Sequence, residues 1–125
     1  MAAAKKLPKK VNVKSLIVQP YGVELIVADD WDELRKYLVK NFKYDCDEDV
    51  EIKGLAGISF CMECAPTGEI KFLQFAQDDQ TLVHECVHSA YHVLDHAGVK
   101  LTADNHEALA YTVDWIYGEC KKWLK

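Results

Sequence analysis

The stretch Thr81–Ala97, which reads TLVHECVHSAYHVLDHA, decides how this chain of 125 residues is interpreted. Asp78 or Asp79 precedes it and can accept hydrogen bonds as a helix N-cap. Gly98 follows it, at the place where the end of a helix favours glycine. The sequence therefore predicts one helix that runs from about residue 79 to Ala97.

Four histidines recur at four-residue intervals along this predicted helix, at positions 84, 88, 92 and 96. The first two enclose HECVH, an HExxH sequence. Residues four apart lie one turn apart on the same helix face, so His84 and His88 can reach one Zn²⁺ ion. Glu85 lies beside the metal without binding it and can accept a proton from an activated water molecule. The alternative is an amphipathic helix whose histidines only decorate a solvent-exposed face.

A helical wheel at about 100° per residue separates the motif from the apolar residues of the same helix. The expected packing face consists of Val83, Val87, Ala90, Leu94 and Ala97. Cys86 points towards the packed side, so its thiol is expected to be an inert part of the core. His92 and His96 turn away from the ligand direction and are expected to be partly exposed, with a second metal site as the alternative.

A last helix is predicted to begin at Asp104 and to reach about Trp123. It carries Glu107, nineteen residues after His88. A catalytic zinc takes a third protein ligand and leaves one position open for water, so Glu107 is the expected third ligand. The alternatives are a capping-box role for Glu107 with Asp104, and His106 as the ligand in its place.

Two faces are expected on this last helix. Glu107, Tyr111 and Asp114 share one face with Ala110 and Gly118, whose small size would permit close approach to the motif helix. The face expected to pack against the rest of the protein consists of Leu109, Val113, Ile116, Cys120 and Leu124.

HECVH, followed by a glycine break and a second helix with NHEALAY at 105–111, resembles the gluzincin branch of the HExxH zincin metallopeptidases. More closely, it resembles the small zincin-like proteins encoded by tailed phages and prophages. The resemblance covers roughly residues 79–118. It implies zinc held by His84, His88 and Glu107, with Glu85 as the general base.

The sequence departs from that family at one position. Many gluzincins place an Asp four residues after the Glu ligand, where it supports a ligand histidine; Tyr111 stands there in this chain. Asp114 or Asp95 are the alternatives for that support. Tyr111 itself is a candidate catalytic residue that donates to a developing oxyanion.

The part of the chain upstream of the motif has the pattern of strands. Strands are predicted at Ser15–Val18, Val23–Ala28, Leu55–Glu63 and Glu69–Phe75, with turns at 19–22 and 65–68. Asp30 begins a helix that reaches about Phe42 and packs through Trp31, Leu34, Leu38 and Phe42. We therefore expect an α+β fold in which residues 11–125 form one minimal zincin-like domain. A small antiparallel or mixed sheet with a backing helix would precede the motif helix and the Glu107 helix.

Composition excludes several classes of protein. A net charge of −5 is unfavourable for binding nucleic acid, and no apolar run approaches the length of a membrane span. The first ten residues are expected to be a flexible basic tail without a secretory signal, so the cytoplasm, of the host if phage-encoded, is the expected compartment. Residues 45–51 are expected to be a solvated acidic loop, with Ca²⁺ binding as the alternative.

The five cysteines are an odd number without a disulfide spacing, so they are expected to be reduced. Cys61 and Cys64 form a CxxC pair, which could hold a structural metal only if the fold brought Cys46 and Cys120 to it.

These features predict a zinc-dependent hydrolase that acts on a peptide or protein. The substrate is expected to lie extended along a sheet edge, either 55–63 or 69–75. The alternative is a phage-encoded protein of zincin shape that serves assembly or inhibits a host factor by binding. A metal-free mimic of DNA, suggested only by the acidic charge, is a weaker alternative. The oligomeric state is not indicated by the sequence.

Overall fold

The computed structural model describes residues 9–43, 55–64 and 68–125. The elements are β1 (Val13–Val18), β2 (Val23–Ala28), α1 (Trp31–Phe42), β3 (Gly57–Cys64), β4 (Glu69–Ala76), α2 (Asp79–His96) and α3 (His106–Trp123). The strands form one mixed sheet in the order β1-β2-β4-β3. The pairs β1/β2 and β3/β4 are antiparallel, whereas β2 and β4 are parallel. The predicted α+β class is confirmed. Among the described residues β3 is an edge strand, whereas β4 lies between β2 and β3, so the expectation that 69–75 could be the edge was wrong.

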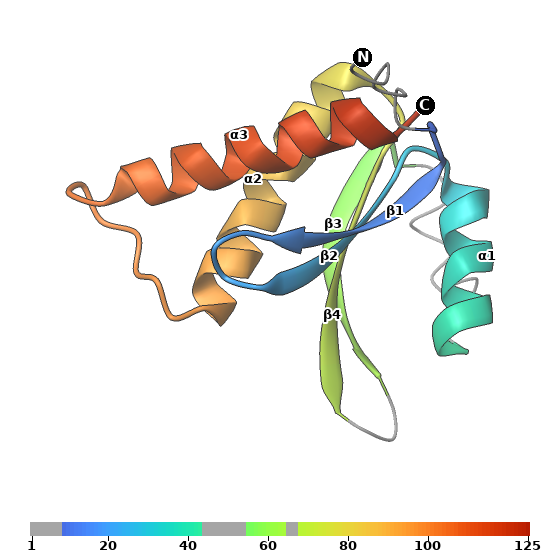
Figure 1. Ribbon diagram of the computed structural model, residues 1–125, viewed down its shortest axis with the longest axis horizontal. Helices are drawn as coiled ribbons and strands as arrows, with labels where there is room; N and C mark the ends of the chain where they lie inside the picture. The colour runs from blue at the N-terminus through green and yellow to red at the C-terminus, as the bar shows by residue number, and fades with distance from the viewer. Residues whose placement is uncertain (1–8, 44–54, 65–67) are drawn as a thin grey trace, which may run out of the picture.

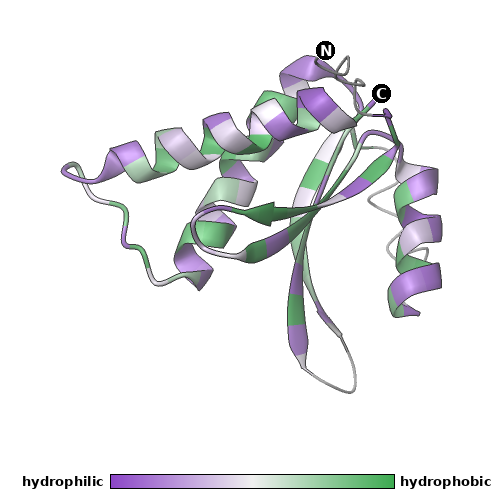
Figure 2. Cartoon of the chain, in the orientation of Figure 1, coloured by the Kyte–Doolittle hydropathy of each residue, from purple (hydrophilic) through white to green (hydrophobic). Residues whose placement is uncertain are grey.

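The sheet lies between two helical layers (Figure 1). Helices α2 and α3 cover one face, and α1 covers the other. Because side chains alternate across a strand, Leu25 and Val27 of β2 join the core beneath α2 and α3, while Ile26 and Ala28 join the core beneath α1. Figure 2 shows that hydrophobic and hydrophilic residues alternate along α2 and α3, as expected for helices with one buried and one exposed face.

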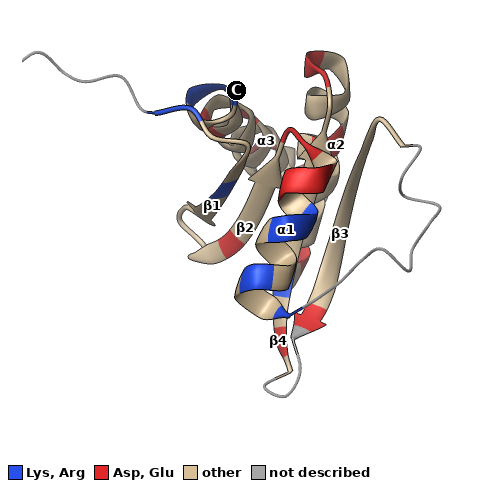
Figure 3. Ribbon diagram, turned by 90° about the vertical axis from the view of Figure 1, so that its right-hand side faces the viewer, with Lys and Arg blue, Asp and Glu red and all other residues tan. Residues whose placement is uncertain are grey.

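The predicted starts of the first two helices are confirmed. The Asp30 carboxylate accepts a hydrogen bond from the Glu33 N–H at the start of α1, and the Asp78 carboxylate accepts one from the Thr81 N–H at the start of α2. Figure 3 shows the acidic first turn of α1 and its basic later turns, an order that suits the helix dipole. Gly98 adopts φ = 78° just after α2, in the left-handed region that favours glycine at the end of a helix.

The predicted start of the last helix was wrong. Asn105, not Asp104, is the N-cap of α3, and its side chain makes no capping hydrogen bond to the helix. The Asn105 carboxamide oxygen instead accepts hydrogen bonds from the backbone N–H and the hydroxyl of Thr102. The capping-box alternative for Glu107 therefore fails, because the cap has moved by one residue.

The expected close approach of α3 to α2 through small residues was wrong. Ala110 and Gly118 are exposed, and a Cβ atom added to Gly118 would meet nothing within 4 Å. The small residues therefore do not bring α3 close to α2. The predicted packing face of the helix is confirmed: Ile116, Cys120 and Leu124 are buried in the core that α2 and the sheet share, and Leu109 and Val113 pack against it. Thr112 is buried as well.

The two ends of the described chain lie side by side (Figure 1). Val11 pairs with Leu124 in a parallel bridge, and the Lys10 ammonium donates to the Lys121 carbonyl. Most of the expected basic tail (1–8), the acidic loop with Cys46 and most of the 65–68 turn lie outside the described residues. Within 9–43, 55–64 and 68–125, no helix is long and apolar enough to cross a membrane.

Candidate metal centre

Helix α2 exposes both motif histidines and buries the glutamate between them. The His84 side chain is 69% exposed, His88 is also exposed, and Glu85 is only 5% exposed as a residue. The residues that α2 buries are Leu82, Glu85, Cys86, Ser89, Ala90, Val93 and Leu94. The histidines therefore occupy the solvent side of the helix, and Glu85 lies at the margin where the helix meets the sheet.

The packing face predicted for α2 was partly wrong. Ala90 and Leu94 are buried as expected, but Val83 is 46% exposed and Ala97 is exposed. The buried face is turned towards Glu85 because polar residues of the helix, Ser89 among them, find hydrogen-bond partners in the sheet. The prediction missed these polar residues because it placed only apolar side chains in the interior of the protein.

The two histidine rings lie in a geometry that suits one metal ion. His84 Nε2 and His88 Nε2 are 3.2 Å apart. Two nitrogen ligands at the usual 2.0–2.1 Å from a tetrahedral zinc ion are separated by about 3.3 Å. Glu85 Oε1 lies 3.9 Å from His84 Nε2. Ligand atoms of His84, Glu85 and His88 all lie within 4.8 Å of one another, so this cluster could hold a metal ion.

The Glu85 carboxylate is buried without a full set of partners. Its Oε2 atom has no hydrogen-bond partner among the described residues. Burial raises the pKa of Glu85, while the neighbouring His88 and His84 rings act in the opposite direction. Leaving a buried polar atom unpaired costs about 1–3 kcal/mol, and such costs are typical of sites that act on a ligand. The donor set and the unpaired oxygen both fit a site for a cation and a water molecule.

The start of the edge strand β3 forms the floor beneath Glu85. A Cβ atom added to Gly57 would lie 2.5 Å from Thr81 Cγ2, 2.8 Å from the Phe75 carbonyl oxygen and 3.1 Å from Glu85 Cγ. Only a residue without a side chain fits there, so Gly57 lets the edge strand pass directly against the glutamate. Sequence analysis did not identify Gly57 as part of the site.

A buried polar network fastens α2 to the two strands beneath it. The Ser89 hydroxyl donates to Gln74 Oε1 at 2.6 Å and lies 2.7 Å from the Ser59 hydroxyl. Ser59 also donates to the Glu85 carbonyl at 3.4 Å. This network fixes the rotation of α2 about its axis, and with it the position of Glu85. The sequence signal was Gln74, a lone polar residue inside the apolar run FLQFA.

Two predicted site residues are not brought to this cluster. Glu107 is exposed in the first turn of α3 and is not part of the group formed by His84, Glu85 and His88. Tyr111, one turn further along, is 77% exposed. The ligand role of Glu107 and the catalytic role of Tyr111 therefore stay predictions.

The remaining histidines and cysteines occupy simpler surroundings. His92 and His96 both pack against the Phe72 ring, with centroids 6.1 and 5.4 Å away. His92 is half-buried and His96 exposed, as expected, and burial lowers the pKa of His92. Cys86 is fully buried, which confirms its place in the core. Among the described residues, no cysteine belongs to a metal-binding group.

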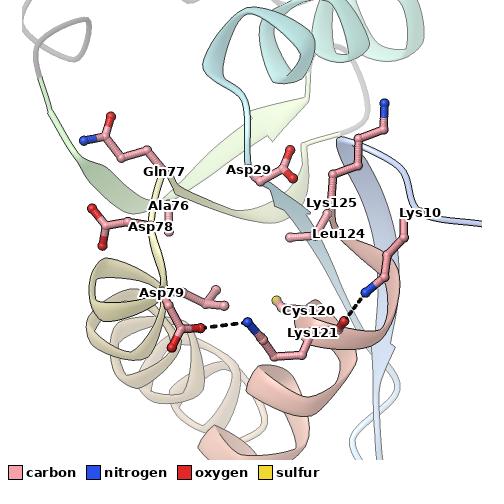
Figure 4. Close-up of a pocket in the computed structure, with 11 residues that line it drawn as sticks. Lys10, Asp29, Ala76, Gln77, Asp78, Asp79, Cys120, Lys121, Leu124 and Lys125 are labelled. Carbon is pink, nitrogen blue, oxygen red and sulfur yellow. Dashed lines mark hydrogen bonds and ion pairs between the residues drawn. The ribbon is translucent and has the colours of Figure 1, made fainter.

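A separate pocket of about 200 Å³ lies beside the first turn of α2 and the end of α3 (Figure 4). Two of its lysines already have partners: the Lys121 ammonium lies 3.1 Å from the Asp79 carboxylate, and Lys10 donates to the Lys121 carbonyl. We therefore assign it no function.

Comparison of the chain with protein-family models, curated proteins and solved structures found no match. The geometry of the cluster on α2 therefore carries the functional interpretation by itself.

Proposed function

We propose that this chain is a zinc-dependent hydrolase of peptide bonds, with His84 and His88 as metal ligands and Glu85 as the general base. One observation carries the proposal. Two imidazole nitrogens 3.2 Å apart on an exposed helix face stand next to a buried carboxylate whose Oε2 atom has no partner among the described residues.

The chemistry of the donors favours zinc. Imidazole nitrogens and carboxylate oxygens form the usual ligand set of catalytic zinc, which keeps a position open. The exposure of both histidines leaves room for a further ligand and for water. We retain Glu107 as the proposed third protein ligand, since it lies in the exposed first turn of α3 with no capping role to occupy its carboxylate.

When bound, zinc polarises the carbonyl group under attack and lowers the pKa of a water molecule to about 7. Glu85 accepts the proton of that water and returns it to the leaving amine. Tyr111 is the proposed donor to the developing oxyanion.

The edge position of β3 supports a peptide as the substrate. An edge strand offers unpaired backbone N–H and C=O groups, to which an extended peptide can add as a further strand. Gly57 brings this strand against Glu85, so a peptide on β3 would run past the proposed metal. The free thiols of Cys61, Cys86 and Cys120 suit a reducing compartment such as the cytoplasm.

The decisive experiment compares the unmodified chain with Glu85→Gln. Asp32→Asn is the matched control, since Asp32 is an exposed carboxylate on α1, across the sheet from the cluster. Zinc content is measured first, and cleavage of casein and of a peptide library second. We expect all three chains to bind zinc, and only Glu85→Gln to lose cleavage.

Bound zinc without cleavage of any substrate by the unmodified chain would overturn the hydrolase proposal. That result would favour the alternative, a protein of zincin shape that acts by binding a partner.

A further inference from the structure

A pocket of about 460 Å³ lies beside the proposed metal ligands, between the start of β3 and the first turns of α2. Its size falls in the range of ligand-binding pockets. The residues that line it are Ala56, Gly57, Asp78, Gln80, Thr81, His84 and Glu85. Strand and helix meet closely at Gly57 and Thr81, so the pocket lies at the margin of this contact.

The charged groups of this pocket are of one sign. Asp78 and Glu85 supply carboxylates, and no Lys or Arg of the described chain lines the pocket. Only 5% of the Glu85 surface is exposed, and its Oε2 atom has no hydrogen-bond partner among the described residues. Because Asp78 and Glu85 both line the pocket, a positively charged ligand there would be attracted by two carboxylates.

Asp78 is held in its ionised form. The backbone N–H of Thr81 donates to Asp78 Oδ1 at 2.8 Å, and this hydrogen bond lowers the pKa of the carboxyl group. Figure 4 shows the Asp78 carboxylate turned away from the lysines on the far side of the neighbouring pocket. Its negative charge is therefore available to the pocket beside His84.

We propose that this pocket binds the positively charged side chain of a lysine or arginine in an extended peptide that lies along β3. The inference rests on the proposed function, because the pocket shares His84 and Glu85 with the proposed metal site. It adds a substrate class: peptides with a basic residue next to the bond that is cleaved.

The test uses a conservative variant of the pocket. Asp78→Asn removes the charge but keeps an effective helix N-cap, because Asn and Asp cap helices about equally well. Asp30→Asn makes the same change at the N-cap of α1, on the other face of the sheet, and is the matched control. The probes are three blocked pentapeptides of alanine with lysine, norleucine or glutamate at the centre, titrated by calorimetry into the metal-free chain, which leaves them uncut.

We expect the unmodified chain to bind the lysine peptide about fivefold more tightly than the norleucine peptide, the upper end of what one exposed ion pair gives. The glutamate peptide should bind most weakly, and high salt should reduce the preference for lysine. Asp78→Asn should prefer lysine over norleucine less strongly, because only the Glu85 carboxylate remains, whereas Asp30→Asn should keep the full preference.

Equal binding of the lysine and norleucine peptides by the unmodified chain would overturn the inference, as would an undiminished preference for lysine in Asp78→Asn. Failure to bind any of the three peptides at millimolar concentration would overturn it as well. Zinc binding and cleavage are measured separately, so the two proposals fail in different ways. A chain that prefers lysine but takes up no zinc refutes the proposed function, whereas a chain that cleaves without a preference refutes this inference alone.

Discussion

Replacing Gly57 by alanine tests whether the edge strand passes directly against Glu85. The added Cβ would lie 2.5 Å from Thr81 Cγ2, 2.8 Å from the Phe75 carbonyl oxygen and 3.1 Å from Glu85 Cγ. The threonine methyl group can rotate away. The carbonyl oxygen cannot move freely, because Ile58 and Phe75 are register partners in the β3–β4 ladder.

The expected effect follows from two opposing contributions. Overpacking against fixed atoms costs up to about 3 kcal/mol, and the stiffer unfolded chain of the alanine variant offsets up to about 1 kcal/mol. We therefore expect Gly57→Ala to lower the free energy of unfolding by about 2 kcal/mol. At about 4 °C per kcal/mol for a chain of this size, the melting temperature should fall by about 8 °C.

Gly118→Ala is the matched control. Gly118 lies inside α3, is exposed, and has nothing within 4 Å of an added Cβ. Alanine is favoured over glycine inside a helix by about 0.5–1 kcal/mol, so this variant should melt about 2–4 °C higher than the unmodified chain. Thermal and urea unfolding followed by circular dichroism measure both. If Gly57→Ala melts at or above the temperature of the unmodified chain, the close approach of β3 to Glu85 is refuted.

Three further predictions follow from other parts of the chain. Burial raises the pKa of Glu24, but hydrogen bonds from Lys71 and Ser15 and the charge of Lys71 outweigh it, so the folded pKa lies below its ordinary value of 4.5. Its stabilisation is therefore present at neutral pH and is lost as the pH falls from about 4.5 through the lowered pKa of the folded state. Glu24→Gln should cost about 1 kcal/mol at pH 7 and less in acid, in urea unfolding; equal costs at pH 7 and in acid would contradict this. Gln74→Ala should cost about 3 kcal/mol, because it leaves a cavity and removes the acceptor of the Ser89 hydroxyl; a loss under 1 kcal/mol would show that the network does not hold α2. Glu107→Gln should weaken zinc binding at least tenfold in competition titrations, and unchanged affinity would remove Glu107 from the proposed ligand set.

The sequence was sufficient where one residue and its near neighbours determine the structure. Asp30 and Asp78 cap their helices and Gly98 ends α2 as predicted, because these signals act within a few residues. The spacing of His84 and His88 likewise determines their shared face. Such local features identified the fold class and all three residues of the cluster on α2, although not the burial of Glu85, from the sequence alone.

The remaining features depend on residues that are far apart in the chain. Glu85 is buried because Gly57 lies under it, and Ser89 because Gln74 and Ser59 bond to it. Neither contact leaves a periodic signal. The edge position of β3 arises from the parallel pairing of β2 with β4, which the sequence also left open.

X-ray absorption at the zinc edge of the chain loaded with one equivalent of zinc tests the central claim most directly. The proposed site predicts a first shell of nitrogen and oxygen at about 2.0–2.1 Å with imidazole scattering beyond it, and no sulfur shell at about 2.3 Å. The signal should disappear when His84 and His88 are both replaced by alanine. A sulfur shell, or zinc retained unchanged by the double variant, would contradict a metal centre on this face of α2.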